Sequence, residues 1–266
     1  MSTQLPVVLV TGASRGLGLA ITKQLLSLNA HVVGVARSQQ ALEALAMEHR
    51  AKPSVTQSSQ EAPQFQYVVG DVTSKDVCQQ AVNHAMNKFG RLDALVPNAG
   101  VLEPITTIAE ADVDQWKRHF DTNFFSIVQL VQVAIPHLRK ALGRVVLVSS
   151  GAASYPYYAW GAYCCSKAAV NQLTNCLAAE ESAITTVAIS PGVVDTAMQD
   201  LIRGQGKESM KPEEHDRFVQ LKVSGQIGKP EQPGHVIASV ALKAEKRLNG
   251  HYLRWNDAEL SDYQLS

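Results

Sequence analysis

The N-terminal part of the chain combines three features that together fit few folds. Residues 6–11 form a continuous apolar run rich in β-branched side chains, and Gly12 ends it. Such a run is typical of a short strand buried on both faces of a parallel sheet. Gly16 and Gly18 follow, and residues 19–26 then repeat apolar side chains at helical spacing. This order predicts the first unit of an α/β fold with a pyrophosphate-binding turn, although the glycines also suit an ordinary tight turn.

Strand-like and helix-like segments alternate along the rest of the chain. Further strands are expected at residues 31–36, 65–71, 92–97, 144–150, 185–190 and 250–255. Further helices are expected at residues 39–50, 77–89, 112–142, 158–180 and 233–247, with a bend or restart at Pro136. The alternation predicts a doubly wound, parallel seven-stranded sheet, Rossmann-like, in a single domain over residues 1–266. Two polar segments are expected outside it: a surface loop at 51–63 and a mobile lid at about 195–228.

Charge and cysteine usage exclude several kinds of partner. The chain has 24 basic and 24 acidic residues, without a basic stripe that would suit nucleic acid. Its N-terminus lacks the basic flank and apolar run of a signal peptide, and no apolar run is long enough to span a bilayer. The four cysteines and eight histidines show no metal-ligand spacing, so we expect free thiols and no metal. These features predict a soluble cytoplasmic protein with no nucleic-acid or membrane partner.

A tyrosine and a lysine stand four residues apart in the expected helix 158–180. Tyr163 and Lys167 therefore lie on one face, one turn apart. A free phenol has a pKa of about 10, and a neighbouring ammonium group lowers it by favouring the phenolate. Such a pair suits proton transfer to or from a carbonyl or alcohol group. The same spacing also fits an exposed pair on a helix surface.

The end of the second expected strand bears on the choice of dinucleotide. An acidic side chain there would bind the ribose 2′-hydroxyl of NAD, whereas this chain has Ala36, Arg37 and Ser38. An arginine suits a 2′-phosphate, and Arg15 in the glycine turn could reach the same group. The sequence favours NADP(H), with two solvated arginines as the alternative. Asp71, at the end of the third strand, either accepts a hydrogen bond from an adenine or caps the next helix.

Several short motifs occur in an order that is far more specific than any one of them. They are Thr11-Gly-Ala-Ser-Arg-Gly-Leu-Gly18, Asp71-Val72, Asn98-Ala-Gly100, Asn123, Ser150, Tyr163-x-x-x-Lys167 and Pro191-Gly192. With them the chain resembles the short-chain dehydrogenases/reductases over essentially its whole length. Segments such as 123–128 and 248–257 resemble the fungal benzil reductases of the (S)-benzoin-forming type, in a group that includes sepiapterin reductases. Pro97 departs from the family pattern and removes one backbone donor.

The resemblance implies a catalytic tetrad of Asn123, Ser150, Tyr163 and Lys167. In it, Ser150 holds the substrate carbonyl oxygen and Tyr163 delivers the proton. Lys167 lowers the pKa of the tyrosine and binds the nicotinamide ribose, and Asn123 anchors a water that links the lysine to solvent. The implied NADP(H) site comprises Gly12, Ser14, Arg15, Gly16, Leu17, Gly18, Arg37, Ser38, Asp71, Val72, Asn98, Ala99, Gly100, Tyr163, Lys167, Pro191, Val193, Val194 and Thr196.

The residues expected near Tyr163 suggest the kind of substrate. The predicted pocket is lined by Ser150, Ala152, Tyr155, Tyr157, Trp160, Tyr163 and Met198. An aromatic wall suits an aryl ketone, although it also fits ordinary packing. With the resemblance, it favours NADPH-dependent reduction of a vicinal diketone such as benzil to a hydroxyketone.

Two alternative functions remain open, and the resemblance also implies an oligomeric state. One alternative substrate is a pterin with a dicarbonyl side chain, which Asp257 could bind if it reaches the pocket. The other alternative is a non-catalytic sensor or scaffold that binds a dinucleotide. The resemblance also implies a homodimer or homotetramer formed through the two long helices at 112–142 and 158–180.

Overall fold

A parallel sheet runs through the centre of the molecule. The structure is a computed structural model of the chain and describes residues 4–49 and 62–265. Within these residues, seven parallel strands pair in the order β3-β2-β1-β4-β5-β6-β7. They are β1 (Val7–Thr11), β2 (His31–Ala36), β3 (Phe65–Val69), β4 (Ala94–Val96), β5 (Arg144–Val148), β6 (Thr185–Ser190) and β7 (Tyr252–Arg254). The predicted doubly wound sheet is confirmed.

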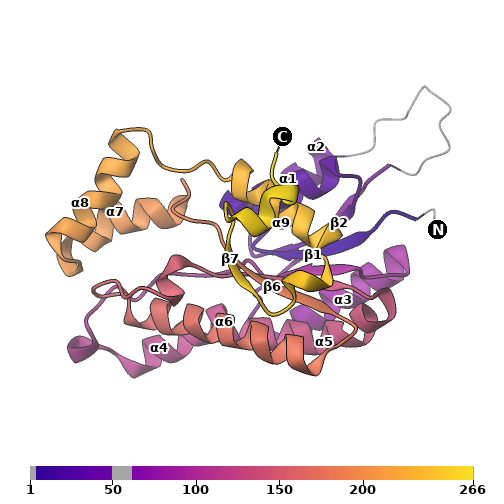
Figure 1. Cartoon of the computed structure of the whole chain (residues 1–266), viewed down its shortest axis with the longest axis horizontal. Helices are drawn as coiled ribbons and strands as arrows, with labels where there is room; N and C mark the ends of the chain where they lie inside the picture. The colour runs from indigo at the N-terminus through magenta and orange to yellow at the C-terminus, as the bar shows by residue number, and fades with distance from the viewer. Residues whose placement is uncertain (1–3, 50–61, 266) are drawn as a thin grey trace.

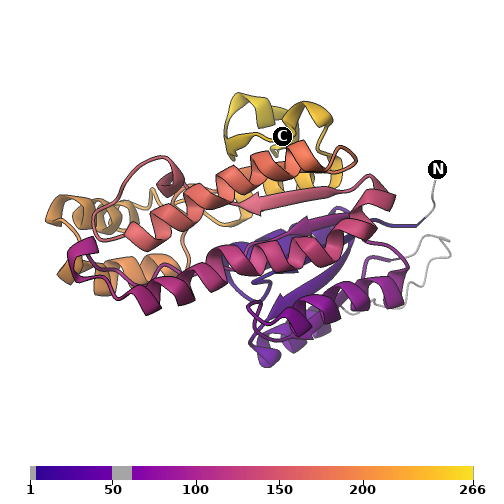
Figure 2. The same ribbon diagram turned by 90° about the horizontal axis from the view of Figure 1, so that it is seen from below.

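Helices cover both faces of this sheet (Figures 1 and 2). They are α1 (Gly16–Ser27), α2 (Gln39–Glu48), α3 (Lys75–Phe89), α4 (Val113–Phe120), α5 (Ser126–Ala141), α6 (Gly161–Glu180), α7 (Ala197–Ser209), α8 (Pro212–Val223) and α9 (Glu231–Lys243). Side chains of α1, α2 and α9 form one apolar core with the sheet. Side chains of α3, α5 and α6 form a second core on the opposite face.

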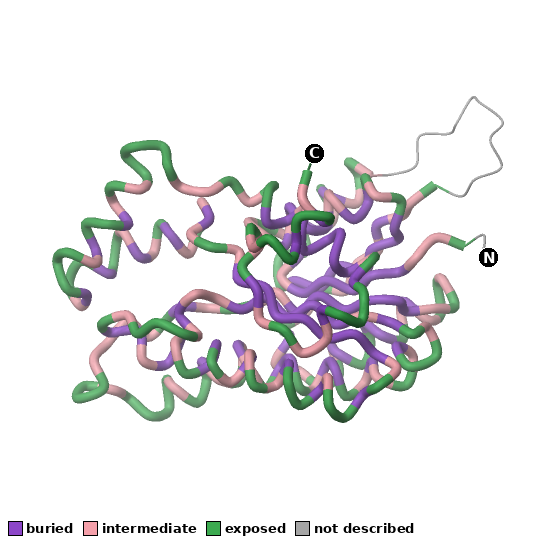
Figure 3. The backbone as a smooth tube through the Cα atoms, viewed as in Figure 1, coloured by how far each residue is buried: buried purple, intermediate pink, exposed green. Residues whose placement is uncertain are grey.

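The strands are buried because both faces of the sheet are covered (Figure 3). Every residue of β1, β2 and β6 is buried. Along β1, Val8 and Val10 join one core, whereas Val7 and Leu9 join the other, as the two-residue period of a strand requires. The strand segments therefore appear in the sequence as continuous apolar runs rather than as alternating patterns.

The predicted long helix at 112–142 is divided, but not at Pro136. A π-helical turn at Asp121–Phe125 joins α4 to α5, and α5 continues through Pro136. The proline cannot donate to the carbonyl of Gln132, but both residues are exposed, so water can satisfy that oxygen. The predicted restart at Pro136 is therefore wrong, and the interruption falls at Asn123 instead.

The segment predicted to be a mobile lid is largely helical. It contains α7 and α8, which project from one end of the sheet (Figure 1). Its ends lie side by side, because Asp195 N donates to Gly228 O at 2.8 Å and Gly228 N donates to Val193 O at 3.0 Å. The segment is thus a compact excursion from the end of β6.

Residues 51–61 of the predicted surface loop lie outside the described residues. Among the residues that are described, no helix is long and apolar enough to cross a membrane. In the same residues, no three His, Cys, Asp or Glu side chains gather in a way that could hold a metal ion. Cys78, Cys164, Cys165 and Cys176 are free thiols.

The turn after β1 depends on a close approach between backbones. Gly12 has a φ of +67°, a conformation that side chains disfavour. A Cβ atom on Gly18 would lie 2.1 Å from the carbonyl oxygen of Gly12 and 2.5 Å from Asn98 Nδ2. The space around Gly18 is therefore already filled by backbone and by a side chain that is itself held in place.

We expect Gly18→Ala to destabilise the fold, because overpacking a filled site costs about 1–3 kcal/mol. The matched control is Gly204→Ala in α7, where an added Cβ meets nothing within 4 Å. Alanine also favours a helix over glycine, so the control should unfold at or above the wild-type temperature. Thermal unfolding followed by circular dichroism checks both variants. An unchanged Tm for Gly18→Ala would contradict the close approach.

Candidate active site

The end of β1 is bonded to the end of β4 at the carboxyl edge of the sheet. Thr11 Oγ1 accepts hydrogen bonds from the backbone N–H groups of Asn98 and Ala99, each at 3.0 Å. The Asn98 side chain donates in return to Thr11 O at 2.9 Å. β1 and β4 are neighbours at the point where the strand order reverses, which is where open α/β sheets bind ligands. Asn98 thus holds the glycine turn at this edge.

The glycine turn, which includes Ser14 and Leu17, faces the loop that follows β6. A Cβ atom on Gly16 would lie 3.1 Å from Thr196 Cγ2, so Thr196 lies beside the N-terminus of α1. Arg15 precedes this helix, is exposed, and makes no side-chain capping bond. The first turn of α1 has no acidic residue. Its N–H groups and the positive end of its dipole therefore favour an anion here.

Arg37 and Ser38 follow β2 at the same edge. Ser38 caps α2, because its Oγ accepts the N–H of Ala41 at 3.3 Å. The Arg37 side chain is 71% exposed and lies 3.9 Å from Asp71 Oδ2. An exposed ion pair at this distance contributes little free energy. The Arg37 guanidinium can therefore exchange this partner for a stronger anion.

Asp71 shapes its own loop and does not cap α3. Its Oδ1 accepts hydrogen bonds from Thr73 N and Thr73 Oγ1, each at 2.9 Å. The N-cap of α3 is Ser74. The alternative interpretation of Asp71 as a helix cap is therefore wrong. Val72, beside it, is buried in the core under the sheet.

Tyr163, Lys167 and Ser150 converge in the interior. Tyr163 and Lys167, both on α6, are only 7% and 4% exposed. The Tyr163 hydroxyl is hydrogen-bonded to the Ser150 side chain, which follows β5. Lys167 Nζ donates to Val148 O at 2.8 Å and lies 5.8 Å from the centroid of the Tyr163 ring. These contacts dock α6 against the end of β5.

Burial, and not the neighbouring cation, sets the pKa of Tyr163. Loss of solvation raises the pKa of Tyr163 to about 12, and the hydrogen bond with Ser150 opposes this shift. Loss of solvation lowers the pKa of Lys167 to about 8. The pKa of Tyr163 is thus raised and not lowered as predicted, because the effect of burial outweighs that of the neighbouring ammonium group. A phenol with this pKa is protonated throughout the neutral range.

Asn123 lies in the π-helical turn and is completely buried. Its Oδ1 accepts the N–H of Val101 and its Nδ2 donates to Val101 O, both at 2.8 Å. A Cβ atom on Gly100 would lie 3.3 Å from Asn123 Oδ1 and 3.8 Å from Lys167 Nζ. The asparagine side chain therefore fixes the segment after β4 beside Lys167, and it leaves only the backbone of Asn123 to anchor a water.

Two neighbours of the tetrad were not predicted. His119 Nε2 lies 2.9 Å from Asn123 Nδ2 and 3.0 Å from Ser166 Oγ. Ser166 Oγ in turn lies within hydrogen-bond distance of Tyr163 O, at 2.9 Å. Each is one helical turn from a tetrad residue, His119 before Asn123 and Ser166 after Tyr163. That spacing is the sequence feature that could have identified them.

An aromatic cluster covers Tyr163. The Trp160 ring meets the Tyr163 ring edge-on, with centroids 5.9 Å apart. The same indole stacks on Tyr157 at 4.7 Å and on Phe218 of α8 at 5.4 Å. Among the described residues, the buried Trp160 Nε1 has no hydrogen-bond partner. Phe218 is thus a neighbour of Trp160 that was not predicted, because it comes from the polar segment expected to be a lid.

The other predicted substrate residues divide into two groups. Ala152 and Met198 belong to the apolar cluster around Tyr163. Tyr155 does not, and it is 58% exposed. Asp257 is turned toward its own chain, since its Oδ2 accepts the N–H of Arg254 at 2.7 Å. Pro191, Val193 and Val194 follow β6, and Val194 pairs with Gly228 at the base of the helical segment.

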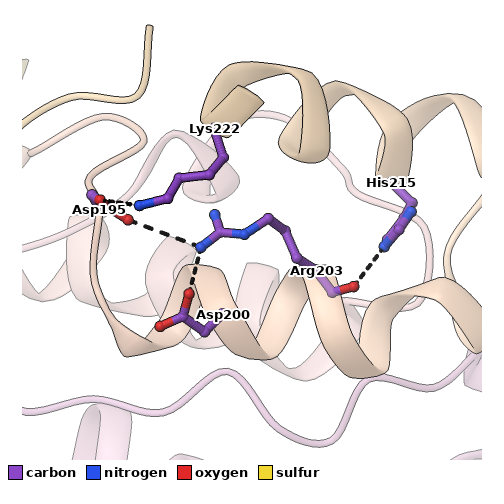
Figure 4. Close-up of polar contacts among 5 residues, drawn as sticks. All are labelled: Asp195, Asp200, Arg203, His215 and Lys222. Carbon is purple, nitrogen blue, oxygen red and sulfur yellow. Dashed lines mark hydrogen bonds and ion pairs between the residues drawn. The ribbon is translucent and has the colours of Figure 1, made fainter. Parts of the chain in front are cut away.

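Polar contacts hold α8 against α7 and against the segment that precedes α7 (Figure 4). Lys222 Nζ of α8 pairs with Asp195 Oδ2, before α7, at 2.5 Å, and Arg203 Nη2 pairs with Asp200 Oδ1 within α7 at 2.5 Å. His215 Nε2 lies 3.0 Å from Arg203 O, where the ring nitrogen must be the donor. These contacts fix α8, and with it the Phe218 ring over Trp160.

Comparisons with known proteins agree with this geometry. Residues 6–206 match the short chain dehydrogenase family. The chain is 45% identical over 251 residues to an uncharacterized oxidoreductase of Schizosaccharomyces pombe, covering 94% of this chain and 96% of that protein. It is 41% identical over 270 residues to a benzil reductase ((S)-benzoin forming) of Saccharomyces cerevisiae, covering 97% and 98%. A crystal structure of a short-chain dehydrogenase/reductase from Saccharomyces cerevisiae has a TM-score of 0.91 at 43% identity, covering 98% and 100%. The chain therefore belongs to the short-chain dehydrogenase/reductase family of oxidoreductases.

Proposed function

We propose that this protein is an NADPH-dependent carbonyl reductase that converts a vicinal diketone, such as benzil, to a hydroxyketone. The observation that carries the proposal is the convergence of Tyr163, Ser150 and Lys167 at the carboxyl edge of the sheet. The hydroxyl groups of Tyr163 and Ser150 are in contact, so both can donate to one carbonyl oxygen as negative charge develops on it. The likeness to a benzil reductase supports the diketone as substrate.

The residues at the glycine turn fit a dinucleotide phosphate. Gly12 and Gly16 have positive φ values, +67° and +53°, which let a backbone approach a pyrophosphate at the N-terminus of α1. Arg37 is an exposed cation directly after Ala36, the position where an NAD-binding site would carry an acid. A 2′-phosphate would draw Arg37 away from its weak pairing with Asp71. When bound, NADPH supplies the hydride that adds to the carbonyl carbon.

Each tetrad residue has a role that its contacts support. Tyr163 donates the proton, since its raised pKa of about 12 keeps it protonated at neutral pH. Ser150 orients the substrate oxygen against the phenol. Lys167, held at the cofactor edge by Val148 O, binds the nicotinamide ribose. Asn123 holds the proton-relay water with its backbone carbonyl, because a π-helical turn interrupts the regular helix hydrogen bonds.

The wall around Tyr163 favours an aryl-substituted dicarbonyl. Tyr157, Trp160 and Phe218 present flat apolar rings. Leaving the buried Trp160 N–H without a partner costs free energy, which a ligand acceptor would recover. A vicinal diketone carries a second carbonyl oxygen beside the reacting one, and we assign it to this donor. The pterin alternative is less favoured, because Asp257 is engaged with Arg254.

We also propose that the protein forms a homo-oligomer through its long helices. Val113, Phe125 and Val128, on and between α4 and α5, are 65%, 48% and 37% exposed. Single exposed apolar residues are ordinary, but these three occur along one stretch of helix. A second copy covering this stretch would remove it from water.

We expect Tyr163→Phe to bind NADPH with nearly wild-type affinity and to lose at least about 100-fold in kcat, the usual contribution of a positioned general acid. NADPH consumption with benzil, and in parallel with sepiapterin, measures turnover. Tyr67→Phe on β3 is the matched control and should keep wild-type rates. Near-normal turnover by Tyr163→Phe would refute the catalytic assignment. Turnover of sepiapterin without benzil would move the proposal to pterin chemistry.

Arg37→Ala should weaken NADPH binding by about 10- to 100-fold, as expected for the loss of hydrogen bonds to a charged group. NADH affinity should change little, because NADH lacks the 2′-phosphate. Fluorescence titration of both cofactors against wild type measures the effect. Arg118→Ala, which removes an exposed arginine of α4, is the control. An equal loss for both cofactors would exclude the phosphate contact.

Trp160→Phe keeps an aromatic ring in the wall but removes the unpartnered donor. We expect kcat/KM for benzil to fall by about 3- to 10-fold, the usual worth of one neutral hydrogen bond. Deoxybenzoin has the same two phenyl rings but only one carbonyl, so its kcat/KM should stay within about two-fold of wild type. The ratio of kcat/KM for benzil to kcat/KM for deoxybenzoin is compared between the variant and the wild type, so the different intrinsic reactivities of the two substrates cancel. A parallel loss for both would show that Trp160 contributes by packing alone.

A further inference from the structure

We propose that His119 is a positioning residue of the active site: its neutral imidazole fixes the orientation of the Asn123 side chain and braces the start of α6 where Tyr163 lies. The inference rests on the proposed function, since it assigns a role relative to the tetrad. His119 lies in the last turn of α4 and is only 2% exposed. It touches two tetrad residues from separate elements, Asn123 in the π-helical turn and Tyr163 on α6.

The hydrogen bonds of His119 determine its protonation. Nδ1 lies 2.7 Å from the backbone carbonyl oxygen of Glu103. A carbonyl oxygen can only accept, so Nδ1 must carry the hydrogen. In a neutral ring Nε2 is then an acceptor. Nε2 lies 2.9 Å from Asn123 Nδ2 and 3.0 Å from Ser166 Oγ, and both of these can donate.

This acceptor gives the Asn123 side chain one orientation. Its Nδ2 donates to Val101 O and to His119 Nε2, and its Oδ1 accepts from Val101 N. Exchanging the amide nitrogen and oxygen of Asn123 would place its oxygen beside two acceptors, Val101 O and His119 Nε2. It would also place its N–H group beside another donor, the N–H of Val101. The buried amide therefore satisfies all its hydrogen bonds only while His119 accepts. Asn123 in turn keeps residues 100–101 beside Lys167 Nζ.

The second connection runs to α6. Ser166 Oγ lies 3.0 Å from His119 Nε2 and 2.9 Å from Tyr163 O, and its one hydrogen can be donated to either acceptor. The His119 ring meets the Tyr163 ring edge-on, with centroids 6.2 Å apart and planes at 82°. His119 therefore contacts the phenol ring and, through Ser166, the backbone that carries it.

Protonation of His119 would break this arrangement. A hydrogen on Nε2 could donate only to Ser166 Oγ, and Nε2 could no longer accept the N–H of Asn123, which would then face a second donor. The titratable groups that face the ring are Tyr163 and Lys167 of α6, while Glu103 offers its backbone carbonyl. Burial lowers the pKa of His119, and the charge of Lys167 lowers it further. The neutral ring is thus retained at neutral pH and somewhat below the ordinary histidine pKa of about 6.5, and its contribution is lost as the pH falls through the lowered pKa.

Two variants separate positioning from packing. Glutamine carries a donor and an acceptor but does not titrate, so His119→Gln can replace both hydrogen bonds. Phenylalanine fills the space but cannot accept. We expect His119→Phe to lose about 10-fold or more in kcat with little change in the KM for NADPH, because the Asn123 N–H is left unsatisfied. We expect His119→Gln to recover most of that loss.

The deciding measurement is kcat for benzil reduction from pH 5 to pH 8. Wild type should lose activity at the acid end, and His119→Gln should lack that decline. An unchanged acid decline in His119→Gln, or wild-type kcat in His119→Phe, would overturn the proposal. If His119→Phe does not fold, the pH profile of His119→Gln decides alone. Tyr163→Phe, measured alongside, separates the two claims, because turnover in that variant defeats the proposed function. The role of His119 then still has its own test: between pH 7 and pH 5, the Tm of His119→Gln should fall less than the Tm of the wild type.

Discussion

The burial of one lysine is the constraint on which the site depends. Lys167 is 4% exposed, and loss of solvation lowers its pKa from 10.5 to about 8. At about 1.4 kcal/mol per pKa unit, keeping this charge inside costs the fold roughly 3 kcal/mol at neutral pH. The single bond to Val148 O offsets part of this cost and fastens α6 to the end of β5. The two apolar cores on either side of the sheet supply the remaining stability.

A layer of buried polar side chains lies beside that lysine. It runs from Ser166 through His119 to Asn123 and ends on the backbone of Val101, which follows β4. In a regular helix from α4 to α5, the Asn123 side chain would have another position. The π-helical turn lets this side-chain amide bond both to His119 of the preceding helix and to Val101 in the loop after β4. The π-helical turn therefore allows the buried side chain of Asn123 to form its hydrogen bonds.

Sequence reasoning succeeded where one local pattern determines one structure. The continuous apolar runs of β1, β2, β5 and β6 can be satisfied only by strands covered on both faces, so their order already implied the sheet. It failed where tertiary contacts decide. The restart predicted at Pro136 does not occur because the affected carbonyl faces water, while the real interruption at Asn123 is stabilised by Val101 from another element. His119 was missed because its partners come from three segments, and a single sequence shows only its spacing from Asn123.

The tetrad residues and the aromatic residues that cover Tyr163 come from different parts of the chain. The glycine turn, Ser150, Tyr163 and Lys167 all lie within residues 6–206, the part that matches the family, and all are placed by the sheet or by helices packed on it. Phe218 lies beyond that part, on α8, whose end is tied by the ion pair of Lys222 with Asp195 to the segment that follows β6. Its ring is 2% exposed and covers Trp160, which in turn covers Tyr163. Phe218 therefore packs behind the Trp160 ring and holds it against Tyr163. Substitutions in α8 can shift that ring while the buried lysine and its polar layer stay as they are.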